Sequence, residues 1–145
     1  MNIRSITFND APQLMSLFEQ IGYPQSVENI EERLESCLKS EIYHGLVYEL
    51  NQIIIGMCFF TIYPSCLKKS HKCILEALVV DGDYRSKGYA TSLIEEVEKI
   101  ALGKGCDSIS LTSNKARLPS IYNFYLTRGY SNDGVKAQWY LKKKL

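Results

Sequence analysis

Apolar and polar residues alternate at the start of the chain and then recur at helical spacing, which predicts a strand followed by two helices. Residues 2–8 alternate as a strand would, and Asp10 precedes Ala-Pro in the manner of a helix N-cap. Apolar residues then recur every three or four positions until Gly22, and glycine commonly ends helices. A second helix is predicted from about Ser26, with an apolar face made by Ile30, Leu34, Cys37 and Leu38.

The middle of the chain has the two-residue period of β-strands. Residues 44–50 and 53–63 are rich in β-branched and aromatic side chains, and Asn51-Gln52 between them predicts a hairpin. Residues 71–80 form a further strand, which we expect to be central because both of its faces are largely apolar. One face would carry Cys73, Leu75, Ala77 and Val79, and the other Ile74, Glu76, Leu78 and Val80.

Helices and strands alternate in the last part of the chain. The pattern predicts helices over 88–102 and 119–128 and strands over 108–112 and 135–141. The order β-α-α-β-β-β-α-β-α-β predicts an α/β fold, with a mixed, mostly antiparallel sheet flanked by helices. We expect one domain over residues 1–145, since this length fits a single core.

Composition and charge exclude several classes of protein. Lys and Arg number 17 and Asp and Glu 16, and this net charge of +1 gives no reason to expect nucleic-acid binding. The most apolar run, residues 53–62, is far shorter than the roughly 20 residues of a membrane-spanning helix. No secretory signal is seen at the N-terminus, and the five cysteines form no C-x-x-C pair. We therefore expect a cytoplasmic protein with reduced thiols and no membrane partner.

The most informative segment joins the strand over 71–80 to the following helix. Here Arg85-x-x-Gly88-x-Ala90 opens the helix, whose first N–H groups are unpaired and carry partial positive charge. Such a helix start suits a phosphate; Gly88 permits close approach, and Arg85 and Lys87 add charge. An ordinary strand–turn–helix joint is the alternative. Neither the P-loop pattern G-x-x-x-x-G-K-[ST] nor the dinucleotide pattern G-x-G-x-x-G is present.

This turn resembles the acetyl-CoA signature R/Q-x-x-G-x-G/A of the GNAT superfamily of N-acetyltransferases. Residues 124–130, with Tyr125 and Gly129, resemble that family's F-Y-x-x-x-G-F/Y motif, and Asn114 follows the preceding strand. The order of elements also agrees across nearly the whole chain. The resemblance implies the acyl-CoA N-acyltransferase fold. It further implies transfer of acetyl from acetyl-CoA to a primary amine of a small molecule or peptide, by direct attack in a ternary complex.

The resemblance also implies where acetyl-CoA binds. The pantetheine arm would pair with the end of the strand over 71–80, the diphosphate would rest on N–H groups of residues 85–91, and Asn114 would contact the arm. The cofactor-binding residues are then Leu78, Val79, Val80, Arg85, Ser86, Lys87, Gly88, Tyr89, Ala90, Thr91 and Asn114. In this family the acceptor site is shaped by the first two helices and their connection, here residues 18–27, and by the loop over 63–69.

Two side chains are candidates for moving protons, because the attacking amine must be neutral and the leaving thiolate must be protonated. Glu76 is the candidate base, since burial on an apolar strand makes a carboxylate a stronger base. The alternative is a carboxylate that only attracts a cationic acceptor. Tyr125 is the candidate acid because of its place in the family motif, and the alternative is a core aromatic residue.

Other readings are weaker but stay open. Cys66, His71 and Cys73 lack a fourth ligand at a familiar spacing, so no metal is expected. His44 and His71 have no recognisable partner and are expected to be ordinary core or surface residues. The alternative function is a catalytically silent acyl-CoA-binding sensor or regulatory module. A third alternative is transfer of a different acyl group, or transfer to an alcohol, on the same scaffold. A homodimer formed through the last strand is a further open alternative.

Overall fold

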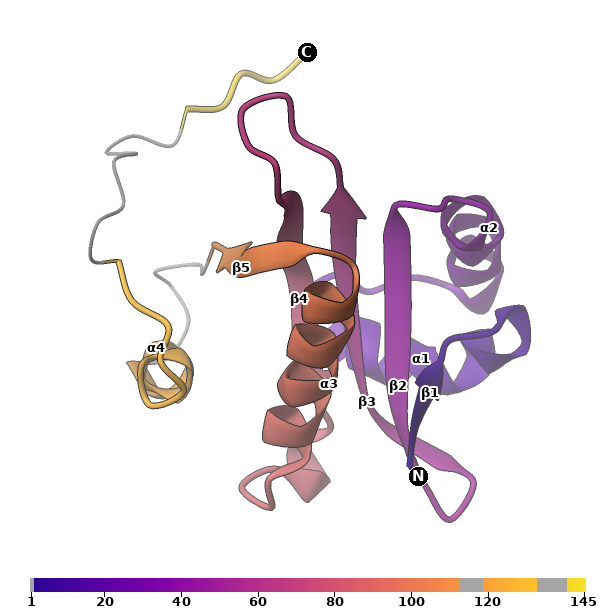
Figure 1. Ribbon diagram of the computed structural model, residues 1–145. Coiled ribbons are helices and arrows are strands. Elements are labelled where there is room, and N and C mark those ends of the chain that lie inside the picture. Colours follow the sequence, from indigo (N-terminus) through magenta and orange to yellow (C-terminus); the bar gives the residue numbers. More distant parts are fainter. Residues whose placement is uncertain (1, 113–118, 133–140) are drawn as a thin grey trace. The chain divides into compact units, whose positions relative to one another are not determined.

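The computed structural model describes residues 2–112, 119–132 and 141–145 (Figure 1). The chain divides into two compact units, Met1–Thr112 and Ser113–Leu145. In the first unit the described residues form a five-stranded sheet in the order β1-β2-β3-β4-β5. Its strands are β1 (Ile3–Ser5), β2 (Tyr43–Leu50), β3 (Ile53–Tyr63), β4 (His71–Val80) and β5 (Cys106–Leu111). The first four strands pair antiparallel and β5 pairs parallel to β4, so the predicted mixed, mostly antiparallel sheet is confirmed.

Helices cover both faces of this sheet (Figure 1). Helices α1 (Ala11–Gln20) and α2 (Val27–Leu38) lie on one face, and α3 (Tyr89–Gly103) lies on the other. Two short 3-10 turns, η1 (Phe8–Asp10) and η2 (Gly82–Tyr84), precede α1 and α3. The core under α1 and α2 includes Ile6, Leu14, Leu17, Ile30, Leu34, Val47, Met57 and Phe59. Helix α3 buries Leu93, Ile94, Val97 and Ala101.

Local sequence signals place most element ends correctly. Asn51 and Gln52 have φ of 50° and 67°, the left-handed conformations of a tight two-residue hairpin. The Ser26 hydroxyl accepts a hydrogen bond from the backbone N–H of Asn29 at 3.2 Å and so caps α2. Gly22 has φ of 96°, as a glycine that ends a helix often does. These three predictions are confirmed because each depends on nearby residues only.

Other expected boundaries differ from the structure. The strand predicted over 108–112 runs from Cys106 to Leu111, and the helices predicted over 88–102 and 119–128 are Tyr89–Gly103 and α4 (Pro119–Leu126). Leu38, expected on the apolar face of α2, is 42% exposed because the helix ends there. The strand predicted over 135–141 falls almost entirely outside the described residues. The expectation of one domain over residues 1–145 stays a prediction.

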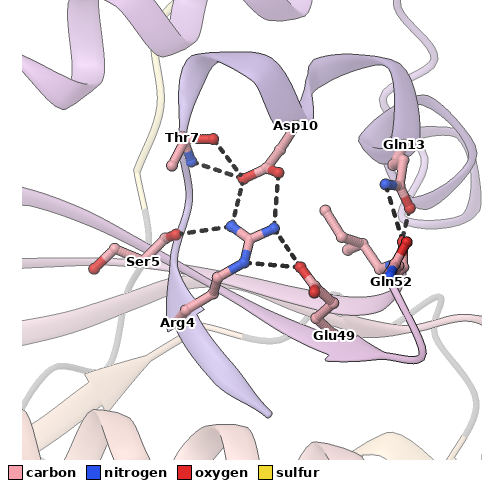
Figure 2. A network of polar contacts seen from close by, with 8 residues as sticks. Arg4, Ser5, Thr7, Asp10, Gln13, Glu49 and Gln52 are labelled. Carbon is pink, nitrogen blue, oxygen red and sulfur yellow. Dashed lines mark hydrogen bonds and ion pairs between the residues drawn. The ribbon is translucent and has the colours of Figure 1, made fainter. Parts of the chain in front are cut away.

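The first strand is shorter than predicted because Asp10 organises the residues before it (Figure 2). Its buried carboxylate accepts hydrogen bonds from the Arg4 guanidinium at 2.8 and 2.9 Å and from the Thr7 backbone N–H at 2.7 Å. Arg4 also donates to Glu49 on β2 at 2.6 and 2.8 Å. Asp10 occupies the predicted N-cap position of α1, with Pro12 in the first turn, but its side chain caps no N–H group of α1. Its oxygens face back toward β1 and bond Thr7, which folds the chain into η1.

We expect Asp10→Asn to destabilise the protein by about 2–3 kcal/mol at pH 7, because it leaves the Arg4 guanidinium without its buried anion. Burial alone would raise the pKa of Asp10, but its hydrogen bonds to Arg4 and Thr7 outweigh burial and lower that pKa. The Asp10 carboxylate therefore stabilises the fold fully above its unfolded-state pKa of about 3.9. This stabilisation is lost as pH falls through the lower pKa of the folded state. Urea unfolding at pH 7 and at pH 3 measures both effects.

The control for this prediction is Glu35→Gln, which removes an exposed ion pair between Glu35 and Lys39 at 3.4 Å. Exposed pairs of this kind contribute little, so we expect a loss below about 0.5 kcal/mol. Equal losses for the two variants at pH 7, or a gap between wild type and Asp10→Asn that does not narrow at pH 3, would contradict the prediction.

Candidate active site

A β-bulge in β4 shapes the centre of the sheet. Leu75 pairs with Phe60 and Ala77 pairs with Phe59, so Glu76 between them has no partner on β3. The extra residue reverses the in-and-out alternation of the strand, and Ala77 packs with Phe59 in the core under α1 and α2. The four side chains expected on one face of this strand therefore divide between the two faces. That prediction is wrong because a period of two fails at a bulge.

Glu76 itself is exposed, so the expected burial among apolar neighbours is wrong. Its carboxylate lies close to the Tyr43 side chain on β2 and to Cys37 on α2. Burial, followed by the Glu76 carboxylate, raises the pKa of the Tyr43 hydroxyl. The same two causes raise the pKa of the Cys37 thiol. Tyr43 was missed in the sequence because nothing local to it signals a carboxylate two strands away.

Beyond the bulge, β4 has an open edge. Strand β5 pairs with residues 71–75, and no other described strand pairs with the rest of β4 on that side. On the β3 side, the backbone N–H of Asp81 donates to the Ile55 carbonyl at 2.8 Å. Because hydrogen-bonded and non-hydrogen-bonded pairs alternate along an antiparallel ladder, the N–H and C=O groups of Leu78 and Val80 point away from β3. They lie along the open edge.

The turn from β4 to α3 gathers unpaired backbone donors. Gly88, the residue before α3, has φ of 88°, and a Cβ placed on it would meet no atom within 4 Å. Residues 85–88 are exposed. Among the described residues, no acceptor takes the backbone N–H groups of residues 86–90. A helix start of this kind, with open space before it, is suited to bind a phosphate or another anion.

The charged side chains of this turn differ in where they point. Arg85, expected to add charge for a phosphate, donates from Nε to the Val80 carbonyl at 3.1 Å and from Nη2 to Gln20 Oε1 at 3.5 Å. The guanidinium therefore ties the turn to the end of β4. Lys87 lies with Nζ 5.7 Å from the centre of the Tyr84 ring, in a cation–π contact beside the turn.

Tyr125 belongs to the second unit, where it lies on α4. Its ring contacts those of Phe124 and Tyr130 edge-on, with centroids 5.2 and 5.6 Å apart. The helix ends in a Schellman motif: the N–H of Tyr130 donates to the Tyr125 carbonyl and that of Gly129 to the Leu126 carbonyl. Gly129 as the end of this helix is thus confirmed. Asn114, the other candidate expected after β5, lies outside the described residues.

The histidines and cysteines do not gather into a site in the described part of the chain. Cys66 and His71 are exposed and Cys73 is buried, and no group of three or more His, Cys, Asp or Glu described here could hold a metal ion. His44 stacks on Phe60 with ring centroids 5.2 Å apart. Burial and then Lys104 lower the pKa of His44. None of the described helices is long and apolar enough to cross a membrane.

Comparison with known proteins connects this geometry to one family. The model of the "Acetyltransferase (GNAT) family" matches residues 10–130. A GNAT family acetyltransferase from Staphylococcus aureus is 23% identical, with 100% of each chain covered and a TM-score of 0.81. A ribosomal-protein-alanine N-acetyltransferase from Brucella melitensis is 17% identical over 99% of this chain and 96% of its own, with a TM-score of 0.75.

An aminoglycoside N-acetyltransferase, AAC(6′)-Iy, solved in complex with CoA, is 18% identical over 98% of this chain and 94% of its own, with a TM-score of 0.80. At these identities the three likenesses show the fold alone. They confirm the predicted α/β fold class, and the family match confirms the resemblance seen in the two sequence motifs.

Proposed function

The chain belongs to the acetyltransferase (GNAT) family, and on that premise we propose that it transfers an acetyl group from acetyl-CoA to a primary amine of a small molecule or peptide. The observation that carries the proposal is the meeting of two sets of unpaired backbone groups at one end of β4. In the described part of the chain these are the N–H and C=O of Leu78 and the N–H of Val80 on the open edge, and the N–H groups of residues 86–90 at the start of α3. The Val80 carbonyl is already bonded to Arg85. Their chemistry fits an amide-bearing arm joined to a diphosphate.

Acetyl-CoA supplies the activated acetyl group as a thioester. We assign its pantetheine arm to the β4 edge over Leu78, Val79 and Val80, where the C=O of Leu78 and the N–H of Val80 can pair as in an added strand. Its diphosphate is assigned to the turn over residues 85–91. The family resemblance further assigns Asn114 as a contact to the arm.

Transfer forms a bond between the amine nitrogen and the thioester carbonyl carbon and breaks the bond from that carbon to sulfur. In our proposal Glu76 takes the amine proton, directly or through a water, and Tyr125 gives a proton to the departing thiolate. The N–H of Leu78 would donate to the carbonyl oxygen as negative charge develops there. The exposure of Glu76 supports this role, since an acceptor amine from solvent can reach it.

The acceptor is assigned by class only. Among the structural neighbours, one is named for ribosomal-protein alanine and another for aminoglycosides, so both a peptide amine and a small-molecule amine occur on this fold. The free cysteines of the described residues support the cytoplasm as the place of action. A silent acyl-CoA-binding module is the second candidate. It would bind CoA but release no thiol from acetyl-CoA with any member of a panel of amines.

We expect titration calorimetry to detect CoA binding by the wild-type protein and by Gly88→Asn, and to find it at least about tenfold weaker in Gly88→Asp. Asparagine and aspartate have the same shape and both tolerate the left-handed φ of this position, so the two variants differ mainly in charge. Only the aspartate brings negative charge to the diphosphate. Equal CoA affinities for the two variants would contradict the assignment of the diphosphate to this turn, and no heat with wild type would contradict the proposal.

We expect Glu76→Gln to lower kcat/KM about 100-fold at neutral pH, because the amine would no longer have a base. Thiol release from acetyl-CoA with a reactive amine of the panel measures this loss. The control Glu95→Gln makes the same change of net charge at an exposed position of α3 and should act like wild type. If Glu76→Gln instead raised KM for the amine and left kcat unchanged, Glu76 would not be the base and would only attract a cationic acceptor.

We expect Tyr125→Phe to lower kcat about tenfold or more with little change in CoA affinity, since only the proton for the thiolate is lost. The matched control is Tyr122→Phe, because Tyr122 lies on the same helix and its side chain is 50% exposed. The same thiol-release assay compares them. Full turnover by Tyr125→Phe would assign this residue to packing alone.

A further inference from the structure

Gln20, the last residue of α1, reaches across to the turn between β4 and α3. Its Nε2 donates to Asp81 Oδ2 at 2.9 Å, and its Oε1 accepts the backbone N–H of Gly82 at 2.9 Å. The same Oε1 lies 3.5 Å from Nη2 of Arg85. One turn earlier on α1, the Ser16 hydroxyl accepts a hydrogen bond from the same Nε2 at 3.0 Å. One side chain therefore contacts the turn at three residues.

Each of these partners is part of the frame of the turn. Asp81 accepts the backbone N–H of Asp83 on Oδ1 at 2.9 Å and that of Tyr84 on its carbonyl at 2.9 Å, which builds η2. Arg85 closes the turn onto the Val80 carbonyl. Gln20 thus fixes the start and the end of the segment that leads into the unpaired N–H groups of residues 86–90.

We propose that Gln20 is a positioning residue for the diphosphate of acetyl-CoA: it holds the turn in its binding geometry without touching the ligand. The inference rests on the proposed function. A turn ordered before binding loses less conformational freedom when the ligand arrives, so affinity for the diphosphate depends on the contacts that order it. The sequence resemblance assigned residues 18–27 to the acceptor side, but this side chain faces the donor side.

Gln13 provides a matched control on the same helix (Figure 2). Its Oε1 accepts the backbone N–H of Ile54 at 2.9 Å and its Nε2 donates to the Gln52 carbonyl at 3.3 Å. It therefore ties α1 to backbone as Gln20 does, but at the β2–β3 hairpin. Gln20→Ala and Gln13→Ala each remove one such bridging amide, and only the first concerns the turn.

The experiment measures binding of three probes by wild type, Gln13→Ala, Gln20→Ala and Gln20→Met. The probes are CoA, 3′-phospho-ADP, which keeps the diphosphate, and pantetheine, which lacks it. The methionine retains the length and flexibility of the side chain, so Gln20→Met serves if Gln20→Ala does not fold. Thermal melting without ligand confirms that each variant tested is folded.

We expect both Gln20 variants to bind CoA and 3′-phospho-ADP about tenfold more weakly, because they lose the hydrogen bonds of Gln20 to Asp81, Gly82 and Arg85. Both should bind pantetheine like wild type. Gln13→Ala should bind all three probes like wild type. In turnover, the Gln20 variants should show a raised KM for acetyl-CoA with kcat nearly unchanged.

Unchanged CoA affinity in the Gln20 variants would overturn the inference. So would an equal loss for pantetheine, or an equal loss in Gln13→Ala, since either would show a general effect of disturbing α1. A wild-type protein that binds neither CoA nor 3′-phospho-ADP would instead overturn the proposed function, which separates the two failures.

Discussion

Strand β4 is paired with β3 along both sides of its bulge but with β5 only as far as Leu75, and the rest of the arrangement depends on this difference. Unpaired N–H and C=O groups must be satisfied by water or by a ligand, and a strand with an open edge offers them in a row. The short turn after Val80 brings the start of α3 to the same end of the strand. Two sets of backbone groups, one along an edge and one at a helix start, therefore adjoin, and the side chains of Arg85 and Gln20 hold the turn between them.

The bulge at Glu76 and the end of the β5 pairing coincide: β5 ends at Leu111, opposite Leu75, directly before the extra residue. A bulge bends its strand and increases the local twist, which does not favour continued pairing with a neighbouring strand. The same residue sends a carboxylate to the face shared with Tyr43, while Leu75 keeps its place beside Phe60. One inserted residue thus places a charged group on the face covered by α1 and α2, at the point where the edge of β4 becomes open.

What the sequence predicts well is local in origin. Gly22, Gly129 and the Asn51-Gln52 hairpin follow from the backbone conformations that these residues adopt easily, and the helix start at Gly88 follows from its strand–turn–helix context. The features it misses depend on distant partners. The bulge is set by the register against β3. Arg4 joins Asp10 to Glu49 on β2, and Gln20 contacts Asp81 and Gly82, about 60 residues later in the chain. No periodicity within a segment encodes such pairings.

The start of α3 is fixed by contacts with the sheet and, through the preceding turn, with α1. Tyr89, its first residue, rests against Tyr48 of β2 with ring centroids 4.8 Å apart. One turn later Leu93 packs over Gly56, where an added Cβ would lie 3.1 Å from its Cδ1 and 3.2 Å from the Val79 carbonyl oxygen, so a larger residue would have to displace its neighbours slightly. Gln20 secures the preceding turn from the opposite face of the sheet. Because packing fixes the helix from one side and hydrogen bonds fix the turn from the other, the N–H groups between them need little further ordering to bind the diphosphate that the proposed function assigns to them.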